Sequence, residues 1–143
     1  MASTLNPYLA FRDNARAALE FYRDVLGGEL TISTFGDFGD ADAPEATLVM
    51  HGQLTTPSGF TLMGSDTPPG MDYSPPSGVS ISLSGDDTDD LRRWFAGLAE
   101  GGQVTMPLEK QMWGDEFGMV TDQFGTAWMV NIAGSGEGEG SAD

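Results

Sequence analysis

The stretch ALEFYRDVLGGEL, residues 18–30, combines most of a helix with its end and the first residues of a strand. Its apolar residues, with those just before it, recur at the spacing of one helix face from Ala15 to Leu26. Gly27 and Gly28 then end the helix, because glycine enters left-handed backbone conformations at little steric cost. The stretch therefore predicts an amphipathic helix followed by a sharp change of direction.

Apolar runs around this helix predict four strands, expected at residues 6–11, 30–35, 46–54 and 60–65. Asp13 or Asn14 is placed to cap the helix. The acidic segment GDFGDADAPE (36–45) is expected to be a mobile loop, and residues 67–77, rich in proline and glycine, are expected to be a linker. These elements together make one β-α-β-β-β module over residues 5–66.

The same order of elements returns in residues 78–133. A shift of 74 residues places Gly27 and Gly28 on the glycine pair 101–102, and a shift of 66 places Met63 on Met129. The expected elements are strands at 79–84, 103–108, 117–122 and 126–132, with a helix that buries Leu91, Trp94, Phe95 and Leu98. We therefore predict an α+β fold of two tandem modules in a single domain, residues 1–133, with residues 134–143 as a disordered acidic tail.

Composition narrows the classes of function. Six basic residues face 22 acidic ones, for a formal net charge of −16. That charge disfavours nucleic-acid binding. Three explanations of it stay open: attraction of a cationic molecule, solubility in high salt, or an acidic amino-acid composition shared by the whole proteome and unrelated to any ligand. The absence of cysteine excludes disulfides, thiolate metal ligands and a cysteine nucleophile. With no apolar run of bilayer length and no signal-peptide pattern, we expect a cytoplasmic protein without membrane contact.

Several stretches carry a family resemblance: NPYLAF, ALEFYRDVLGGEL, VMHGQL (49–54) and MPLEKQMWGDEFGMVTDQFGTAWMV (106–130). Over residues 5–133 the sequence resembles the vicinal oxygen chelate superfamily, which includes glyoxalases, bleomycin-resistance proteins and extradiol dioxygenases. Within that superfamily it is most similar to the PhnB-like branch. The resemblance implies that the modules form a curved, cup-like mixed sheet with the helices outside, and that two chains form a homodimer.

Enzymes of this superfamily hold a divalent metal with one side chain from the first and last strand of each module, usually His, Gln or Glu. The positions that match here are Asn6, Met63, Ser80 and Met129. Amide and hydroxyl oxygens are weak neutral donors, and methionine prefers soft metals, so none of the four suits a hard divalent cation. The resemblance therefore carries over the fold without a metal or other cofactor, and Met129 is expected to line an apolar pocket.

His51 is the single histidine of the chain. It is either a general base or a half-buried strand residue with a structural role. The segment WGDEFG (113–118) either rims the ligand cleft or plugs it. No catalytic residue is assigned, and the candidates are His51, Asp115 and Glu116.

The candidate residues of a ligand pocket are Asn6, Met63, Ser80, Trp113, Phe117 and Met129. The methionines are either a soft, adaptable pocket wall or core filler, and those considered are Met50, Met63, Met112, Met119 and Met129.

Three functions fit these observations. The first is a metal-free, PhnB-like protein that binds a small cationic or aromatic molecule in the cleft between the sheets. The second is a lyase, isomerase or dioxygenase-type enzyme that acts on a small dicarbonyl or phenolic substrate. The third is a module without a ligand, whose dimer surface is its purpose.

Overall fold

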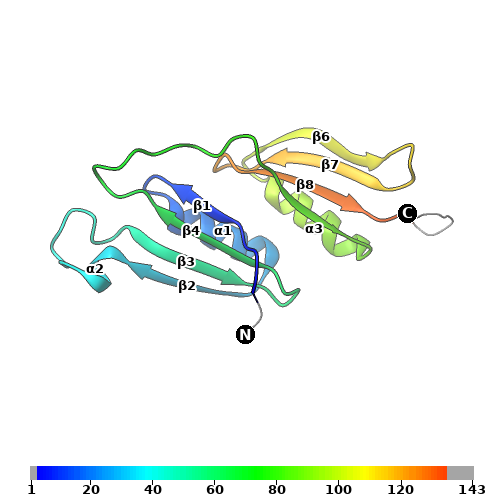
Figure 1. Ribbon diagram of the computed structural model, residues 1–143. Coiled ribbons are helices and arrows are strands. Elements are labelled where there is room, and N and C mark those ends of the chain that lie inside the picture. Colours follow the sequence, from blue (N-terminus) through cyan, green and yellow to red (C-terminus); the bar gives the residue numbers. More distant parts are fainter. Residues whose placement is uncertain (1–2, 135–143) are drawn as a thin grey trace. The chain divides into compact units, whose positions relative to one another are not determined.

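The computed structural model describes residues 3–134 and divides between Pro76 and Ser77 into two compact units. Each unit contains one four-stranded mixed sheet and one helix of 12 residues (Figure 1). The predicted α+β class and the two β-α-β-β-β units are confirmed. The predicted tail lies outside the described residues, apart from Gly134.

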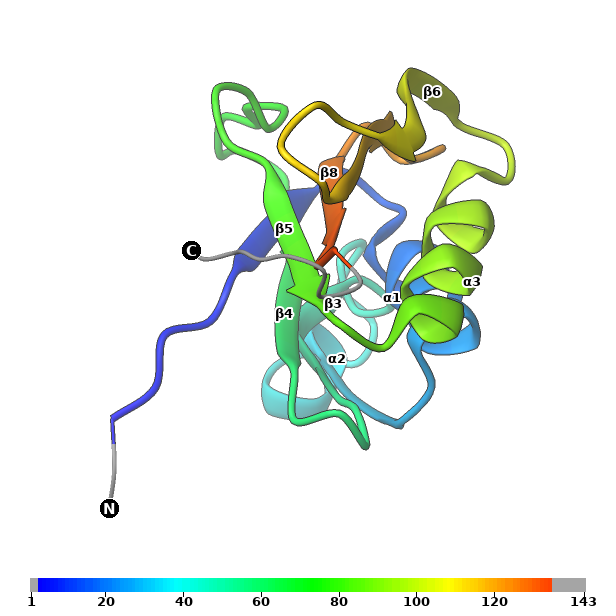
Figure 2. The same cartoon turned by 90° about the vertical axis from the view of Figure 1, so that its right-hand side faces the viewer.

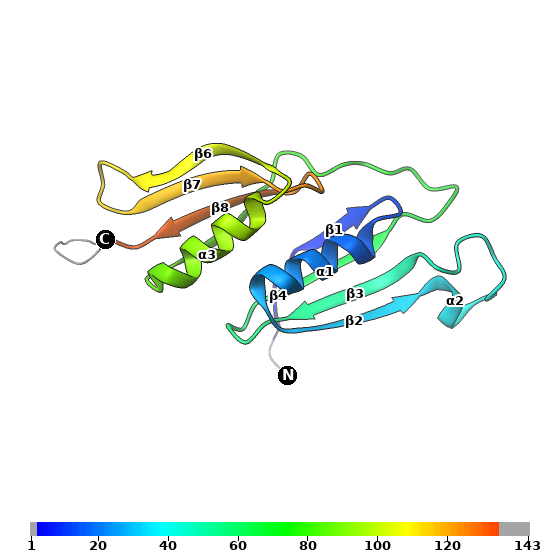
Figure 3. The same cartoon turned by 180° about the vertical axis from the view of Figure 1, so that it is seen from behind.

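The first unit contains β1 (Tyr8–Phe11), α1 (Ala15–Leu26), β2 (Glu29–Thr34), α2 (Phe35–Phe38), β3 (Val49–Thr55) and β4 (Thr61–Asp66). Its sheet has the order β1-β4-β3-β2, with β1 parallel to β4 and the other pairs antiparallel. α1 runs along one face of this sheet, as Figure 3 shows from behind. That face holds the core of the unit.

The second unit contains β5 (Ile81–Gly85), α3 (Thr88–Ala99), β6 (Gln103–Lys110), β7 (Glu116–Thr121) and β8 (Ala127–Ile132). The order β5-β8-β7-β6 repeats that of the first unit, and β5 is parallel to β8. α3 lies on one side of β5 and β8 (Figure 2). As predicted, α3 buries Leu91, Trp94, Phe95 and Leu98.

Two local expectations were wrong. Residues 36–38 belong to the short helix α2 rather than to a loop, because Thr34 and Asp37 form a reciprocal capping box. The side chain of Asn14 does not cap α1. Instead Asp66, at the end of β4, accepts hydrogen bonds from the backbone N–H of Ala15 and of Val49, both at 2.9 Å. A buried carboxylate from another strand thus caps the helix and ties it to β3.

The second glycine of each pair is required by a close approach of two backbone segments. A Cβ added at Gly28 would lie 2.2 Å from the carbonyl oxygen of Thr55, and one at Gly102 would lie 2.3 Å from that of Thr121. Any side chain at these positions would displace the end of the third strand of the unit. The glycine pairs therefore mark the same packing contact in both units.

Candidate functional site

The sheet of the second unit has one face covered by α3 and an opposite face that we call the second open face. Residues of β7 and β8 that point toward α3 are buried, namely Gly118, Val120, Trp128, Val130 and Ile132. The second open face carries the alternate residues, which are half-buried on these two strands. Period-two alternation thus separates a packed face from an accessible one.

Two rows of side chains cross the second open face, because the strands are paired in register. In the order β5, β8, β7, β6, the first row is Ser82, Met129, Met119 and Met106, and the second row is Ser84, Asn131, Phe117 and Glu109. We call Met129, Met119 and Met106 the methionine row. The predicted pocket residues Met129 and Phe117 therefore lie on one face of one sheet.

Trp113 extends the second row. It lies in the turn between β6 and β7, and its ring centroid is 6.4 Å from that of Phe117, with the ring planes at 58°. The side chain is 60% exposed. Two rings tilted in this way present an apolar surface, and the exposed π face of each ring attracts cations.

Asp115 holds a negative charge beside these rings. Its carboxylate accepts hydrogen bonds from Asn131 Nδ2 at 3.0 Å and from the backbone N–H of Gly134 at 2.8 Å. The bond from Asn131 lowers the pKa of Asp115 the most and the bond from Gly134 lowers it next, and a hydrogen bond from Trp113 adds to the effect. The carboxylate is therefore both fixed in position and ionised at neutral pH.

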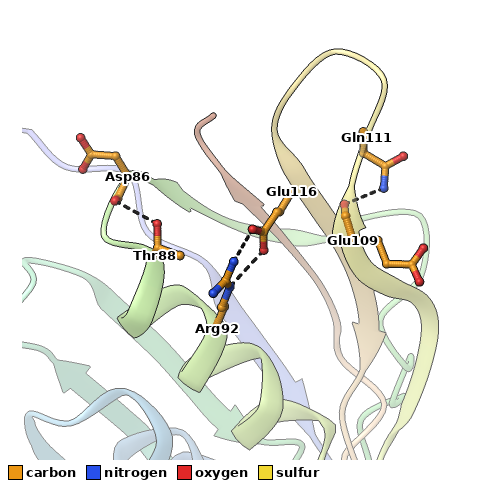
Figure 4. A network of polar contacts seen from close by, with 6 residues as sticks. All are labelled: Asp86, Thr88, Arg92, Glu109, Gln111 and Glu116. Atoms are coloured by element: carbon orange, nitrogen blue, oxygen red, sulfur yellow. Dashed lines mark hydrogen bonds and ion pairs between the residues drawn. The ribbon is translucent and has the colours of Figure 1, made fainter. Parts of the chain in front are cut away.

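Glu116 is not part of this group. It is bonded to the guanidinium of Arg92 on α3, with Arg92 Nε 3.1 Å from Oε1 and a second bond from Nη2 to Oε2 (Figure 4). The hydrogen bond between them lowers the pKa of Glu116 and raises that of Arg92. Glu116 thus joins β7 to α3 on the packed side, while its neighbour Phe117 points to the second open face.

The first unit has an equivalent open face with different chemistry. Tyr8, Met63, Gln53 and Thr31 form one row across β1, β4, β3 and β2. The hydroxyl of Tyr8 lies 3.2 Å from His51 Nδ1, and the two rings are 5.7 Å apart. His51 is half-buried, and its imidazole is already in contact with the Tyr8 phenol. It belongs to the first unit, whereas Asp115 belongs to the second.

Asn6 and Ser80 lie just before β1 and β5. The residues directly opposite Met63 and Met129 are Tyr8 and Ser82, each two positions later. This pairing adds a phenol and a hydroxyl to the donors considered from sequence. None of these side chains is an imidazole or a carboxylate.

The donor chemistry does not fit a hard divalent metal. Mg²⁺, Mn²⁺ and similar ions take carboxylate or imidazole ligands in this kind of site. Within residues 3–134, His, Cys, Asp and Glu side chains form no group of three that could hold a metal ion. Asn6, Ser80, Met63 and Met129 offer amide, hydroxyl and thioether groups instead, and the paired Tyr8 and Ser82 add a phenol and a hydroxyl.

The structure thus brings together Trp113, Phe117, Asp115 and Met129 in the second unit, and places Met63 and His51 in the first. Among the residues of the open faces that sequence reasoning missed are Tyr8, Asn131 and Met106. Two of them had a usable signal, since Tyr8 and Asn131 lie two positions after Asn6 and Met129 on the same strand period. Met106 had none, because a shift in the pairing of β6 with β7 places it opposite Met119.

Comparison with known proteins gives consistent matches. Residues 4–130 match the family model Glyoxalase/Bleomycin resistance protein/Dioxygenase superfamily. Protein YjdN of Escherichia coli strain K12 is 31% identical over 140 residues, covering 90% of this chain and 94% of that protein.

No helix within residues 3–134 has the length and apolar character needed to cross a membrane.

Two solved structures extend the match. The crystal structure of protein PA1353 from Pseudomonas aeruginosa is 42% identical, with a TM-score of 0.83, and the match covers 94% of this chain and 100% of that one. A Bacillus cereus structure named as a putative 3-demethylubiquinone-9 3-methyltransferase, PhnB protein, has a TM-score of 0.74 over 92% of this chain and 100% of that one. At 22% identity, the second likeness shows the fold alone.

Proposed function

Because the chain belongs to the Glyoxalase/Bleomycin resistance protein/Dioxygenase superfamily, we propose that it binds a small, flat, cationic molecule on the second open face. The observation that carries this proposal is the grouping of Trp113 and Phe117 beside the fixed carboxylate of Asp115. Binding there requires no hard divalent metal. The ligand would stack on the rings and place its positive charge near the carboxylate.

Three properties of the site support a cation over a neutral or anionic ligand. An exposed tryptophan face attracts positive charge, by about 0.5–1 kcal/mol at an exposed site. Asp115 is ionised and its orientation is set before the ligand arrives, so little ordering is needed on binding. The net charge of −16 raises the local concentration of cations around the whole chain.

The methionines beside the rings support tolerance for ligand shape. Met119 and Met129 lie in the adjacent row of the same face and are half-buried. Unbranched thioether side chains adapt to irregular apolar surfaces. A family of related flat molecules, rather than a single compound, fits such a wall.

A direct test uses the tryptophans. Trp113 is 60% exposed, whereas Trp94 and Trp128 are 3% and 1% exposed. N-methylacridinium should quench the Trp113 emission and raise the melting temperature, and the anion 9-anthracenecarboxylate at the same concentration should do neither. A ligand at 100 times its Kd stabilises by about 2.7 kcal/mol, which is readily seen as a shift in Tm.

Matched variants locate the site. Trp113→Ala lacks the reporting indole, so it is read by the melting temperature, and the stabilisation by N-methylacridinium should disappear. Asp115→Asn should weaken binding at least fivefold at low salt. Asp72→Asn removes one exposed charge outside the second unit and serves as the control. Equal loss for Asp115→Asn and Asp72→Asn would mean that only the overall charge acts, and binding by Trp113→Ala would place the ligand elsewhere.

One observation favours an enzyme as the alternative function. The hydroxyl of Tyr8 and the imidazole of His51 are 3.2 Å apart on the first open face, and such a pair can move a proton on a small dicarbonyl or phenolic substrate. Faster exchange of the methyl protons of methylglyoxal in D2O, lost in His51→Gln and in Tyr8→Phe, would support it. One tightly bound divalent metal per purified chain would also favour it over the binding function. A homodimer and a cytoplasmic location remain predictions.

A further inference from the structure

Phe117 lies between two acidic positions on the second open face. Glu109 on β6 is directly opposite Phe117. On the other side, Asn131 on β8 is opposite Phe117 and holds the carboxylate of Asp115 at 3.0 Å. Neighbouring strands are about 4.8 Å apart, so the backbones at Glu109 and Asn131 are separated by roughly 10 Å, with Phe117 between them. Negative charge therefore flanks this ring on two sides.

An irregularity in β6 places Glu109 on this face. Met106 is opposite Met119. If that register continued, Glu109 would be opposite Glu116, on the side of α3. The pairing shifts between Met106 and Glu109, so Glu109 is opposite Phe117 instead, and Figure 4 shows its side chain pointing away from Glu116. A shift of one residue moves a side chain to the other face of a sheet, and bulges of this kind redirect side chains beside functional sites.

The repeat does not require an acidic residue at this place. In the matching row of the first unit, Ala10 is opposite Ser65 and Ser33 is opposite His51, and none of these four is acidic. Packing does not require one either, because Glu109 is exposed. Neither the repeat nor the core therefore explains the acidic side chain beside Phe117.

The basic residues of the second unit lie away from this face. They are Arg92, Arg93 and Lys110. Arg92 and Arg93 belong to α3, where they are paired with Glu116 and Asp90. Lys110 is opposite Glu116 and therefore on the side of α3. The two carboxylates of the second open face thus have no counter-charge from their own unit on that face.

Resting on the proposed function, we infer that the ligand is a dication whose two positive groups stand at opposite ends of a flat apolar centre. The centre stacks on the rings, with one charge near Asp115 and the other near Glu109. The two groups are at most about two strand spacings apart, roughly 10 Å. A monocation leaves one carboxylate without a partner, whereas a dication meets both. At about 0.15 M salt the screening length is about 8 Å, so these two charges act on the ligand more strongly than the distant acidic residues do.

Two compounds of the same shape separate the effect of charge from that of stacking. N-methyl-4-phenylpyridinium carries one positive charge, and methyl viologen carries a second one at the far end of the same two-ring system. Isothermal titration calorimetry of the full chain at about 0.15 M salt measures both affinities. Methyl viologen should bind about three- to fivefold more tightly, which is what one exposed ion pair supplies.

Matched variants locate the second charge contact. Glu109→Gln should lower the affinity for methyl viologen to that for N-methyl-4-phenylpyridinium. Glu100→Gln removes the same charge from the exposed C-terminal end of α3, and it should keep the preference. Both side chains are exposed, so both variants should melt at the wild-type temperature.

The outcomes distinguish this inference from the proposed function. Equal affinity of the wild-type chain for the two compounds would overturn the inference and leave the proposed function standing. Equal loss of the preference in Glu109→Gln and Glu100→Gln would do the same, since only the overall charge would then act. Failure of both compounds to bind would overturn the proposed function as well.

Discussion

Asp122 holds together the turn between β7 and β8, and its replacement is the change whose cost the structure defines best. The side chain is 3% exposed. Its Oδ2 accepts a hydrogen bond from Trp128 Nε1 at 2.8 Å, and Oδ1 accepts from the backbone N–H of Phe124 and Thr126 at 2.8 and 3.1 Å. One buried carboxylate thus satisfies three donors.

Asp122→Asn keeps the shape and removes one acceptor. The amide oxygen can still serve the two backbone donors, but its NH2 group then faces the indole N–H, which also donates. Trp128 is 1% exposed, so water cannot take over the lost bond. A buried donor left without its charged acceptor costs about 2–4 kcal/mol of unfolding free energy.

Urea unfolding followed by tryptophan fluorescence measures this cost in the right place, because Trp94, Trp113 and Trp128 all lie in the second unit. A double-mutant cycle with Trp128→Phe isolates the pair. With the indole donor removed, Asp122→Asn should cost less than about 1 kcal/mol, which leaves a coupling energy of about 1.5–3 kcal/mol. An equal cost in both backgrounds, or a cost below about 0.5 kcal/mol in the wild-type background, would refute the reasoning.

Three further predictions concern stability and use the same urea assay with far-UV circular dichroism. Glu116→Gln should reduce the amount of stability that the protein loses in acid. The pKa of Glu116 is lowered in the folded state. Its contribution to the free energy of unfolding is therefore complete above the unfolded pKa of about 4.3 and is lost as the pH falls through the folded pKa. Unfolding curves at pH 7 and pH 3 measure this effect, and an unchanged pH dependence would show that the pair with Arg92 contributes nothing. Asp13 has a φ of 68°, so Asp13→Gly should raise the free energy of unfolding by roughly 0.5–1 kcal/mol, as relief of left-handed strain exceeds the added chain entropy; a lower midpoint would contradict this. Gly102→Ala should lower the free energy of unfolding by about 3 kcal/mol, because its Cβ meets the Thr121 carbonyl oxygen at 2.3 Å. Gly125→Ala, with open space around a φ of 91°, should lower it by about 1–2 kcal/mol from backbone strain alone. A larger loss for Gly125→Ala than for Gly102→Ala would contradict the close contact at Gly102.

Much of the fold follows from local patterns. The apolar faces of α1 and α3 are visible as helical periodicity, and the second glycine of each Gly-Gly pair lies where a side chain would meet a neighbouring backbone. Even the missed helix α2 has a local signal, since Thr34 and Asp37 stand three residues apart as a capping box requires. These features depend on neighbours within one or two turns of chain, so residue order is enough to predict them.

The candidate site was only partly predictable. Trp113, Phe117 and Asp115 are close in the chain, and their grouping follows from the turn between β6 and β7. Asn131, which holds Asp115 in place, comes from a strand 16 residues away. The candidate Glu116 adjoins this group in sequence but faces α3, because neighbouring residues of a strand point to opposite sides.

Periodicity and glycine spacing in the chain suffice to predict two repeated α+β units, because both patterns depend only on residue type and interval. The contents of each open face required the fold. Asp66 reaches α1 across 51 residues of sequence, and the shift in β6 turns Met106 toward Met119. The physical reason is that strand pairing over long separations sets which face a side chain occupies, and a slip of one residue reverses that assignment.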